Sequence, residues 1–396
     1  AALFRSALGR LAVHYGPLDP RMFEARMGLG NSFTRGGRLA AADSVLQANV
    51  DAARALPSDT GGILIDQLNA LGALRLNQRR HAEAIPIVRE AWERARDKWG
   101  EDVPAALYNL SNLGYAYRME SRYGEAEPIA RDVLRLMRRV LGERHPNTAT
   151  AWNNVALVLN ARGKHAEAEQ PARQALEIYR ELYGAEHQRV ALGIGNLANV
   201  LVSLGRLAEA EGLQRDALAM RQRVLIPEHI EIAIGHGSLG QTLELQGRFA
   251  EAERMYRRAL EILTRGSGTD SPDGGANYAN LGGVLLRMGR TDEAERALRT
   301  ALEIQRRWLP ASHAGTSATL NSLGVLLTRT GRAAEAEPLL REALETRTAL
   351  LDSTHWAIQE SRSAFGDCIA TLGRRSDAEP LLAGSADALV KQLGAS

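Results

Sequence analysis

Apolar and polar residues follow one pattern that recurs along the whole chain. In its clearest copy, Trp152, Val155, Ala156 and Leu159 recur at i, i+3, i+4 and i+7, the spacing of one face of a helix. Gly163 follows this stripe and can end the helix, because glycine tolerates a left-handed backbone. The pattern predicts a first helix, named helix A here, that ends at a glycine turn.

A second apolar stripe follows the turn and predicts a longer helix, named helix B. It consists of Ala168, Ala172, Ala175, Leu176 and Tyr179. Glutamates and a proline stand in the first turn of this helix, where the helix dipole favours acidic groups and where the N–H groups lack intrahelical partners. One unit is therefore helix A, a short turn, helix B and a turn back.

This unit recurs nine times with a constant period of 42 residues. A fixed period of this length predicts a solenoid, in which each unit packs on its neighbours. We number the repeats by their turn residue, which is Gly37, Arg79, Ser121, Gly163, Gly205, Gly247, Gly289, Gly331 and Gly373.

The period also predicts how the chain is divided. Residues 21–396 form nine repeats, and residues 1–20 hold the helix B of a truncated repeat. Residues 265–275 keep the period but contain four glycines and a proline, so we expect a hinge there. The chain starts without Met, inside a helical pattern, and we expect it to be a fragment of a longer protein.

Small residues mark the places where helices A and B are expected to touch. A glycine or alanine stands seven residues before every turn residue, and an alanine stands five residues after it in all nine copies. Side chains this small allow two helices to pack at the short end of the usual interaxial distances. The latter positions are Ala42, Ala84, Ala126, Ala168, Ala210, Ala252, Ala294, Ala336 and Ala378.

These small residues, with Trp152 and Leu197 at the large positions, resemble the tetratricopeptide repeat. The eight extra residues per unit, the Glu-Ala-Glu-Pro start of helix B and the Leu-Gly-x-x-His-Pro turn are similar to the kinesin light chain type. The resemblance implies an all-α, right-handed superhelix that binds proteins or peptides and has no catalysis of its own. Similar repeats occur in bacterial proteins, often fused to protein kinase or nucleotide-binding regulatory domains.

Composition narrows the possible partners and compartments. The net charge is only +2, whereas nucleic-acid binding needs clustered, unopposed positive charge. The basic residues are almost all arginine, which fits a bacterial source. Cys368 is the single cysteine, so neither a disulfide nor a thiolate metal site is expected. No apolar run reaches about 18 residues, which predicts no membrane span, and we expect a cytoplasmic protein without a cofactor.

Three recurring motifs could carry chemistry, and each has a simpler structural interpretation. The histidines at one turn position could bind a metal, but repeats lie too far apart to share one ion, so a turn role is favoured. The loop from Gly266 lacks the Gly-Lys-Ser/Thr ending of a phosphate-binding loop. The recurring Glu-x-Glu pairs and the arginines ten residues after the turn predict ion pairs on a solvated face. The histidines are His145, His187, His229, His313 and His355.

The functional surface is then expected to be the inner groove, which helix A lines in tetratricopeptide arrays. Carrying those inward positions over to this sequence gives a candidate peptide-binding groove in repeats three to five. Its residues are Tyr108, Ser111, Tyr115, Arg118, Met119, Asn153, Leu157, Asn160, Asn199 and Ser203.

Tyrosine and arginine are frequent interface anchors, and asparagine can bond a peptide backbone. We therefore expect a protein or peptide ligand that is partly acidic and contains an aromatic residue. The alternative is that the chain is the sensory or substrate-docking region of a larger bacterial regulator. Helical-repeat RNA binding and a helical-scaffold hydrolase are less favoured, since acidic residues occupy inward positions and no catalytic constellation is found.

Overall fold

The structure is a computed structural model that describes residues 2–56, 62–310, 313–351 and 355–393. Within these residues the chain is α-helical and contains no strand, so the predicted all-α repeat fold is confirmed. The helices are α1 (Ala2–His14), α2 (Pro20–Arg35), α3 (Leu39–Arg54), α4 (Ile63–Asn77), α5 (His81–Trp99), α6 (Pro104–Met119), α7 (Tyr123–Leu141), α8 (Pro146–Ala161), α9 (His165–Tyr183), α10 (Gln188–Ser203), α11 (Leu207–Val224), α12 (Ile230–Leu245), α13 (Phe249–Arg265), α14 (Pro272–Arg287), α15 (Thr291–Trp308), α16 (Ala314–Arg329), α17 (Ala333–Leu350), α18 (Trp356–Thr371) and α19 (Arg375–Leu393).

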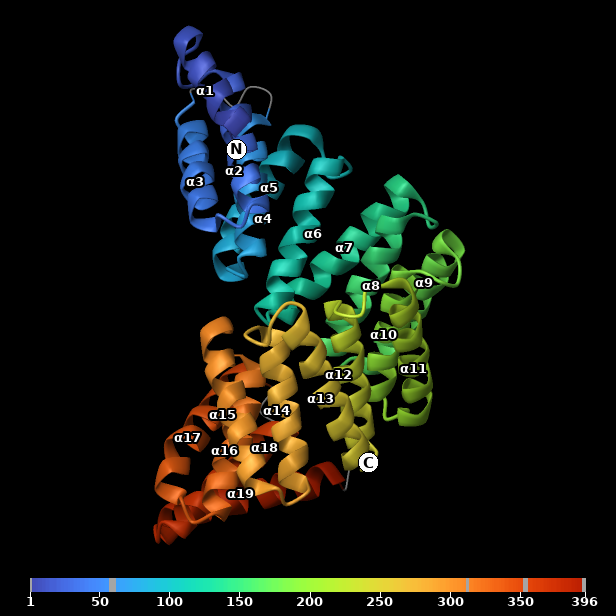
Figure 1. The fold of residues 1–396 in the computed structure, drawn as a ribbon, viewed down its shortest axis with the longest axis vertical. Coiled ribbons are helices and arrows are strands. Elements are labelled where there is room, and N and C mark those ends of the chain that lie inside the picture. Colours follow the sequence, from blue (N-terminus) through green and yellow to red (C-terminus); the bar gives the residue numbers. More distant parts are fainter. Residues whose placement is uncertain (1, 57–61, 311–312, 352–354, 394–396) are drawn as a thin grey trace. The chain divides into compact units, whose positions relative to one another are not determined.

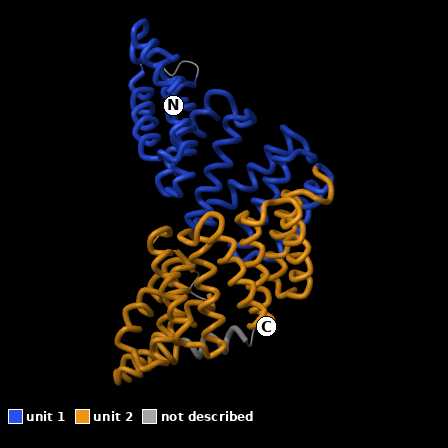
Figure 2. Tube along the Cα trace, viewed as in Figure 1, with its two compact units in different colours: residues 1–182 blue, residues 183–396 orange. Residues whose placement is uncertain are grey.

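The even-numbered helices from α2 onward are the predicted helices A, and the odd-numbered helices from α3 onward are the helices B (Figure 1). The chain divides into two compact units, residues 1–182 and residues 183–396 (Figure 2). In the first unit α6 packs on α7 and α7 packs on α8. In the second unit α10, α11 and α12 pack in the same order.

The turn between helices A and B depends on one residue with a left-handed backbone. Gly163 has a φ of 78°, and its neighbour Lys164 donates its N–H to the Leu159 carbonyl oxygen at 2.9 Å. This bond closes the end of helix α8 as glycine C-caps usually do. Arg79 and Ser121 replace the glycine in repeats two and three, and both are held at a φ of 58°.

The small residues lie where the sequence pattern placed them, between the two helices of a repeat. A Cβ added to Gly324 on α16 would lie only 2.4 Å from Leu340 Cγ on α17, and one on Gly282 would lie 2.6 Å from Leu298 Cγ. Ala168 is fully buried. The absence of a larger side chain at these positions is therefore what lets the helices of a pair approach.

The five recurring histidines cap the N-termini of helices A. The Nδ1 atom of His145 accepts the N–H of Asn147 at 3.1 Å, and His187, His229, His313 and His355 accept in the same way at 3.0–3.2 Å. The predicted turn role is thus confirmed in the specific form of an N-cap. Among the described residues, no three His, Cys, Asp or Glu side chains are grouped so as to hold a metal ion.

The segment expected to be a hinge is shorter than its glycine content suggests. Helix α13 ends at Arg265 and α14 begins at Pro272, so residues 272–275 are helical. Ser271 caps α14 by accepting the N–H of Gly274 at 3.3 Å. A Cβ on Gly274 would lie 2.0 Å from the Thr269 carbonyl oxygen, so this glycine permits a close turn. Whether the remaining connector moves stays a prediction.

Candidate functional site

A groove opens between helices α6 and α8, with the C-terminal half of α7 as its floor. Its largest pocket has a volume of about 420 Å³. The walls hold Leu107 and Tyr108 from α6, Met137 from α7, and Thr150 and Asn154 from α8. We call this pocket and the small one beside it the α6–α8 groove. Its apolar floor suits a hydrophobic or aromatic side chain.

Two tyrosines on α6 stand at the edge of this groove. The side chains of Tyr108 and Tyr115 are 50% and 40% exposed, which is unusual for aromatic rings inside a packed array. They are seven residues apart and therefore lie on the same face of one helix. Tyr115 also meets the ring of His81 edge-on, at 5.9 Å between centroids. The exposed parts of the two rings remain available to a ligand.

Arg118 lies one helical turn beyond Tyr115, in a second, smaller pocket that shares Ser111 and Asn154 with the first. Its guanidinium carbon is 5.4 Å from the centroid of the Tyr115 ring. Within the described part of the chain, the guanidinium of Arg118 forms no hydrogen bond or ion pair. Burial lowers the pKa of Arg118, but a guanidinium still carries its charge at neutral pH. The groove thus presents a half-buried cation that lacks a counter-ion.

The other predicted groove residues lie in different environments. Met119, Leu157 and Asn160 are half-buried, and Asn153 is only 6% exposed. The Asn160 Oδ1 atom lies 2.7 Å from the His165 Nδ1 atom. The groove role of these four residues stays a prediction.

Asn199 and Ser203 belong to α10, in the second unit, and are exposed. Asn199 lines a pocket among α10, α11 and α12. The sequence analysis missed Asn154, which lines both pockets of the α6–α8 groove. The position nine residues before the turn could have revealed it, because asparagine recurs there. The members are Asn112, Asn154, Asn196 and Asn280.

Ion pairs link successive helices B, as the sequence predicted for the glutamate pairs and the arginine row. Glu127 on α7 accepts from Arg131 of its own helix at 3.0 Å, from Arg162 at 2.5 Å and from Lys164 of the next repeat at 3.1 Å. In the second unit Glu253 pairs with Arg257 and Arg290 at 2.8 and 2.7 Å. These arginines are occupied by partners inside the protein.

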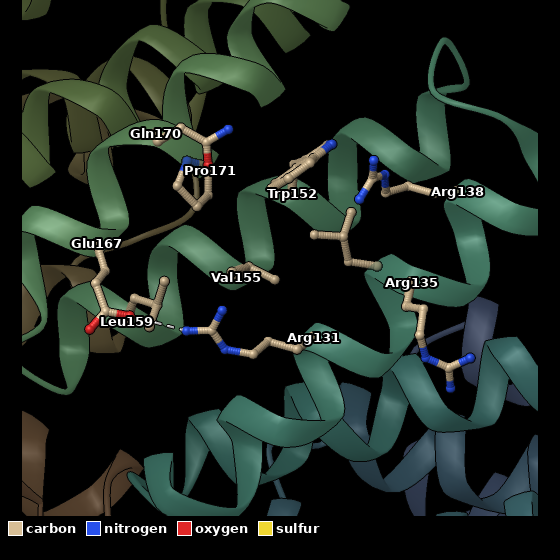
Figure 3. A pocket seen from close by; sticks show the side chains of 10 residues that line it. Arg131, Arg135, Arg138, Trp152, Val155, Leu159, Glu167, Gln170 and Pro171 are labelled. Atoms are coloured by element: carbon tan, nitrogen blue, oxygen red, sulfur yellow. Dashed lines mark hydrogen bonds and ion pairs between the residues drawn. The ribbon is translucent and has the colours of Figure 1, made fainter.

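Figure 3 shows a pocket that is bordered by Arg131 of this row and by two further arginines of α7. Its volume is about 460 Å³. Arg131, Arg135 and Arg138 come from α7 and Trp152 comes from α8. Arg138 lies over the Trp152 ring, with its guanidinium carbon 5.5 Å from the centroid.

The three arginines of this pocket are each neutralised by carboxylates. Arg131 reaches Glu167 at 3.2 Å, Arg138 reaches Glu143 at 2.5 Å and Arg135 reaches Asp132 at 3.4 Å. The unpaired Arg118 therefore makes the α6–α8 groove the better candidate for binding an acidic ligand.

No helix in the part of the chain that the structure covers is long and apolar enough to cross a membrane. Comparison with curated proteins found no match. Comparison with known families matches the tetratricopeptide repeat to residues 102–181, 188–265 and 275–349.

Several solved structures resemble the chain. A Rap protein in complex with competence and sporulation factor is 15% identical, covers 92% of this chain and 99% of its own, and has a TM-score of 0.56. The apo quorum sensor NprR from B. thuringiensis is 12% identical, with coverages of 92% and 98% and a TM-score of 0.58. BtubC from P. vanneervenii is 26% identical over 57% of this chain and 90% of its own, with a TM-score of 0.47.

The first two structures share the fold over nearly the whole chain, and the family match covers more than half of its residues. The spacing of small residues, the left-handed turns and the paired helices are the features of the same repeat. The chain therefore belongs to the tetratricopeptide repeat family.

Proposed function

We propose that this protein is a peptide-binding scaffold without catalysis of its own, and that its α6–α8 groove holds a short segment of a partner protein. The segment carries an acidic residue for Arg118 and an aromatic or large apolar residue for the neighbouring pocket. Its backbone runs along α6, within reach of the Asn154 amide. The family supports a protein-binding scaffold in general, and the ligand chemistry is our addition.

The observation that carries the proposal is the unpaired guanidinium of Arg118 beside the exposed Tyr115, on the same helix as the exposed Tyr108. A half-buried cation without a counter-ion retains most of its capacity to bind a carboxylate, in two-pronged geometry. Tyrosine offers a large contact area with only two side-chain torsions to fix. The pocket of about 420 Å³ lies next to these groups and has an apolar floor.

The pairing of the arginines on helices B supports a protein ligand over a nucleic acid. Nucleic acids are held chiefly through phosphates, which need a stripe of free positive charge. In this chain Arg131, Arg257 and Arg290 are already paired with glutamates. The Rap structure that shares the fold contains a bound factor, which supports a similar use of the groove here.

Panning a random peptide library on the whole chain tests the proposal. We expect recovered peptides to share an acidic residue close to an aromatic or large apolar residue. Arg118→Glu should reverse the charge preference, so that basic residues replace acidic ones. Tyr115→Ala should weaken binding about tenfold or more, the loss expected of an interface anchor.

Two controls distinguish a loss of binding in the α6–α8 groove from a general change in charge or stability. Arg296→Glu changes an exposed arginine on α15 and should leave the recovered peptides unchanged. Melting temperatures of all variants show whether Tyr115 is structural instead. The proposal is wrong if peptide binding survives both groove substitutions while the melting temperature falls.

A further inference from the structure

Another candidate site lies in the second unit, among helices α10, α11 and α12, and the inference drawn from it does not depend on the function proposed above. Two adjoining pockets there have volumes of about 230 and 140 Å³. They share Leu192, Arg221 and Glu231. We call the two pockets together the α10–α12 site. It occupies the repeat positions of the α6–α8 groove, two repeats further along the chain.

The centre of the site is Arg221 on α11, whose residue is only 6% exposed. A buried guanidinium costs free energy unless its N–H groups are bonded and its charge is paired. Its Nη2 atom lies 3.5 Å from the Ala191 carbonyl oxygen and 3.5 Å from Glu231 Oε2. Both distances are beyond the usual length of a charge-assisted hydrogen bond, so Arg221 is poorly satisfied.

Gln214 lies seven residues before Arg221 on the same helix face and lines the smaller pocket. Its residue is 4% exposed, and neither its amide nitrogen nor its amide oxygen has a hydrogen-bond partner among the residues that the structure describes. The other repeats have apolar or aromatic residues at this position. They are Leu46, Val88, Ala130, Ala172, Tyr256, Leu298, Leu340 and Leu382.

Two glycines keep the guanidinium of Arg221 open to the pockets. A Cβ on Gly195 of α10 would lie 3.2 Å from the Arg221 Nη2 atom, and a Cβ on Gly235 of α12 would lie 3.1 Å from its Nη1 atom. Both glycines line the smaller pocket. Because both positions are glycine, helices α10 and α12 place no side chain against the guanidinium of Arg221 at these two points.

Repeat eight contains the same arginine in a closed form. Arg347 stands at the position of Arg221, and its Nη1 atom donates to Glu360 and the Ala357 carbonyl oxygen at 2.8 Å and to the Ser361 hydroxyl at 2.9 Å. In repeat six, Ile234 and Gly235 occupy the positions of Glu360 and Ser361. The chain thus supplies three close partners for Arg347 and only two distant ones for Arg221.

We propose that the α10–α12 site binds a carboxylate group, which Arg221 holds in two-pronged geometry and to which Gln214 donates its amide N–H. The ligand takes the place that Glu360 takes at Arg347. Glu231 stands at the mouth of the site with 37% of its side chain exposed, so it can move aside and compete with the ligand. The carboxylate comes either from an acidic side chain of a bound peptide or from a free small carboxylic acid.

The charges favour a carboxylate over a phosphate. In these two pockets Arg221 is the buried arginine, the exposed Arg189 lines the larger pocket, and Glu231 already offsets part of the charge of Arg221. A phosphate dianion needs more positive charge than this, whereas a planar carboxylate matches one guanidinium fork. The combined pocket space is adequate for a short acidic side chain.

The test observes the arginine side chains of the whole chain by NMR, with 15N-labelled arginine. N-acetylglutamate methylamide represents a peptide side chain, and glutarate represents a free acid. N-acetylglutamine methylamide is the uncharged control, and inorganic phosphate is the competing anion. We expect a carboxylate probe to shift the Arg221 Nε–H signal saturably and to leave that of Arg347 in place.

Four variants locate the effect. Arg221→Met, which copies Met137 of the α6–α8 groove, should weaken binding about tenfold or more. The double variant Ile234→Glu, Gly235→Ser copies Glu360 and Ser361, the partners of Arg347, and should abolish the shift while Arg221 remains. Glu231→Gln should tighten binding about threefold, since a partly exposed competitor is removed. Arg347→Met is the matched control and should bind like the wild type.

The outcomes distinguish between the two ligand sources, and some of them would overturn the proposal. Tighter binding of the capped amino acid assigns the site to a peptide, and tighter binding of glutarate assigns it to a small molecule. The proposal is overturned if no carboxylate shifts the Arg221 signal, if the glutamine derivative shifts it equally, or if phosphate binds more tightly. None of these variants changes a residue of the α6–α8 groove. The proposed function and the α10–α12 site can therefore fail independently.

Discussion

The α6–α8 groove and the α10–α12 site are built from the same repeat positions, yet they present different chemistry. Where α7 has Ala130 and Met137, α11 has Gln214 and Arg221. Where α6 has the exposed Tyr115, α10 has Asn199. The first is an apolar pocket with an unpaired cation at its edge, and the second has its cation buried at the centre.

This difference shows how a repeat protein separates folding from recognition. The positions that join helices A and B keep small residues in both units, as at Ala126 and Ala210. The positions that face the space between consecutive helices A vary, because side chains of several sizes can be accommodated there. One period can therefore present two pockets with different chemistry.

The two units also differ in how their helices begin and turn. In the second unit His187, His229, His313 and His355 cap helices A, whereas in the first unit only His145 does so among the described helices. In the first unit two of the left-handed turns are made without glycine. The contrast in the turns predicts that the two units respond differently to turn substitutions.

The largest expected difference between the units is in acid. Burial lowers the pKa of His236 on α12 to about 4, and Arg258 adds to the shift. The folded state favours the neutral form of His236, so the contribution of this group to the free energy of unfolding is fully present above pH 6.5. It falls as the pH drops from 6.5 towards 4, by about 3 kcal/mol in total.

Burial also lowers the pKa of His313, which caps α16, and a protonated Nδ1 atom could not accept the N–H of Gly315. Hydrogen exchange followed by mass spectrometry should show the second unit losing protection first as the pH falls. His236→Leu, which copies Leu110 of repeat three, should remove most of the difference. Equal loss in both units would contradict this.

Overpacking of a helix pair should have the next largest effect, and it should be similar in the two units. Ala168 and Ala210 are fully buried at the same position, so leucine at either should cost about 1–3 kcal/mol. Urea unfolding measures the loss, which is expected to spread into adjacent repeats. Ala208→Leu, at an exposed site of α11, is the control, and unchanged unfolding in both buried variants would refute the assigned contact.

Exchange of the turn residues should have the smallest effect, with opposite signs in the two units. Arg79 and Ser121 adopt a φ of 58°, and Gly247 adopts 76° with no atoms within 4 Å of an added Cβ. Glycine at position 79 or 121 should stabilise the protein by about 1 kcal/mol, and Gly247→Ser should destabilise it by about as much. Melting temperatures that move in the same direction for both exchanges would disprove the backbone explanation.

The candidate groove could be predicted in part. Tyr108, Ser111, Tyr115 and Arg118 line its pockets as the inward positions of helix A. Asn153, which was also expected to face the groove, is 6% exposed, and its neighbour Asn154 lines both pockets. Adjacent positions on a helix differ by about 100° in direction. An error of one residue in the expected orientation therefore moves a side chain from the groove to the core.

The sequence by itself determined the repeat: its period, its two helices, its small contact residues and its turns. These follow from patterns within one unit, which local geometry and the burial of one apolar face control. Only the tertiary structure decided that the guanidinium of Arg118 has no partner among the described residues and that Arg221 has only distant ones, while Arg131 and Arg347 have close ones. Whether a charged side chain is paired depends on side chains from neighbouring helices. The period of the sequence does not determine the distances between their charged atoms.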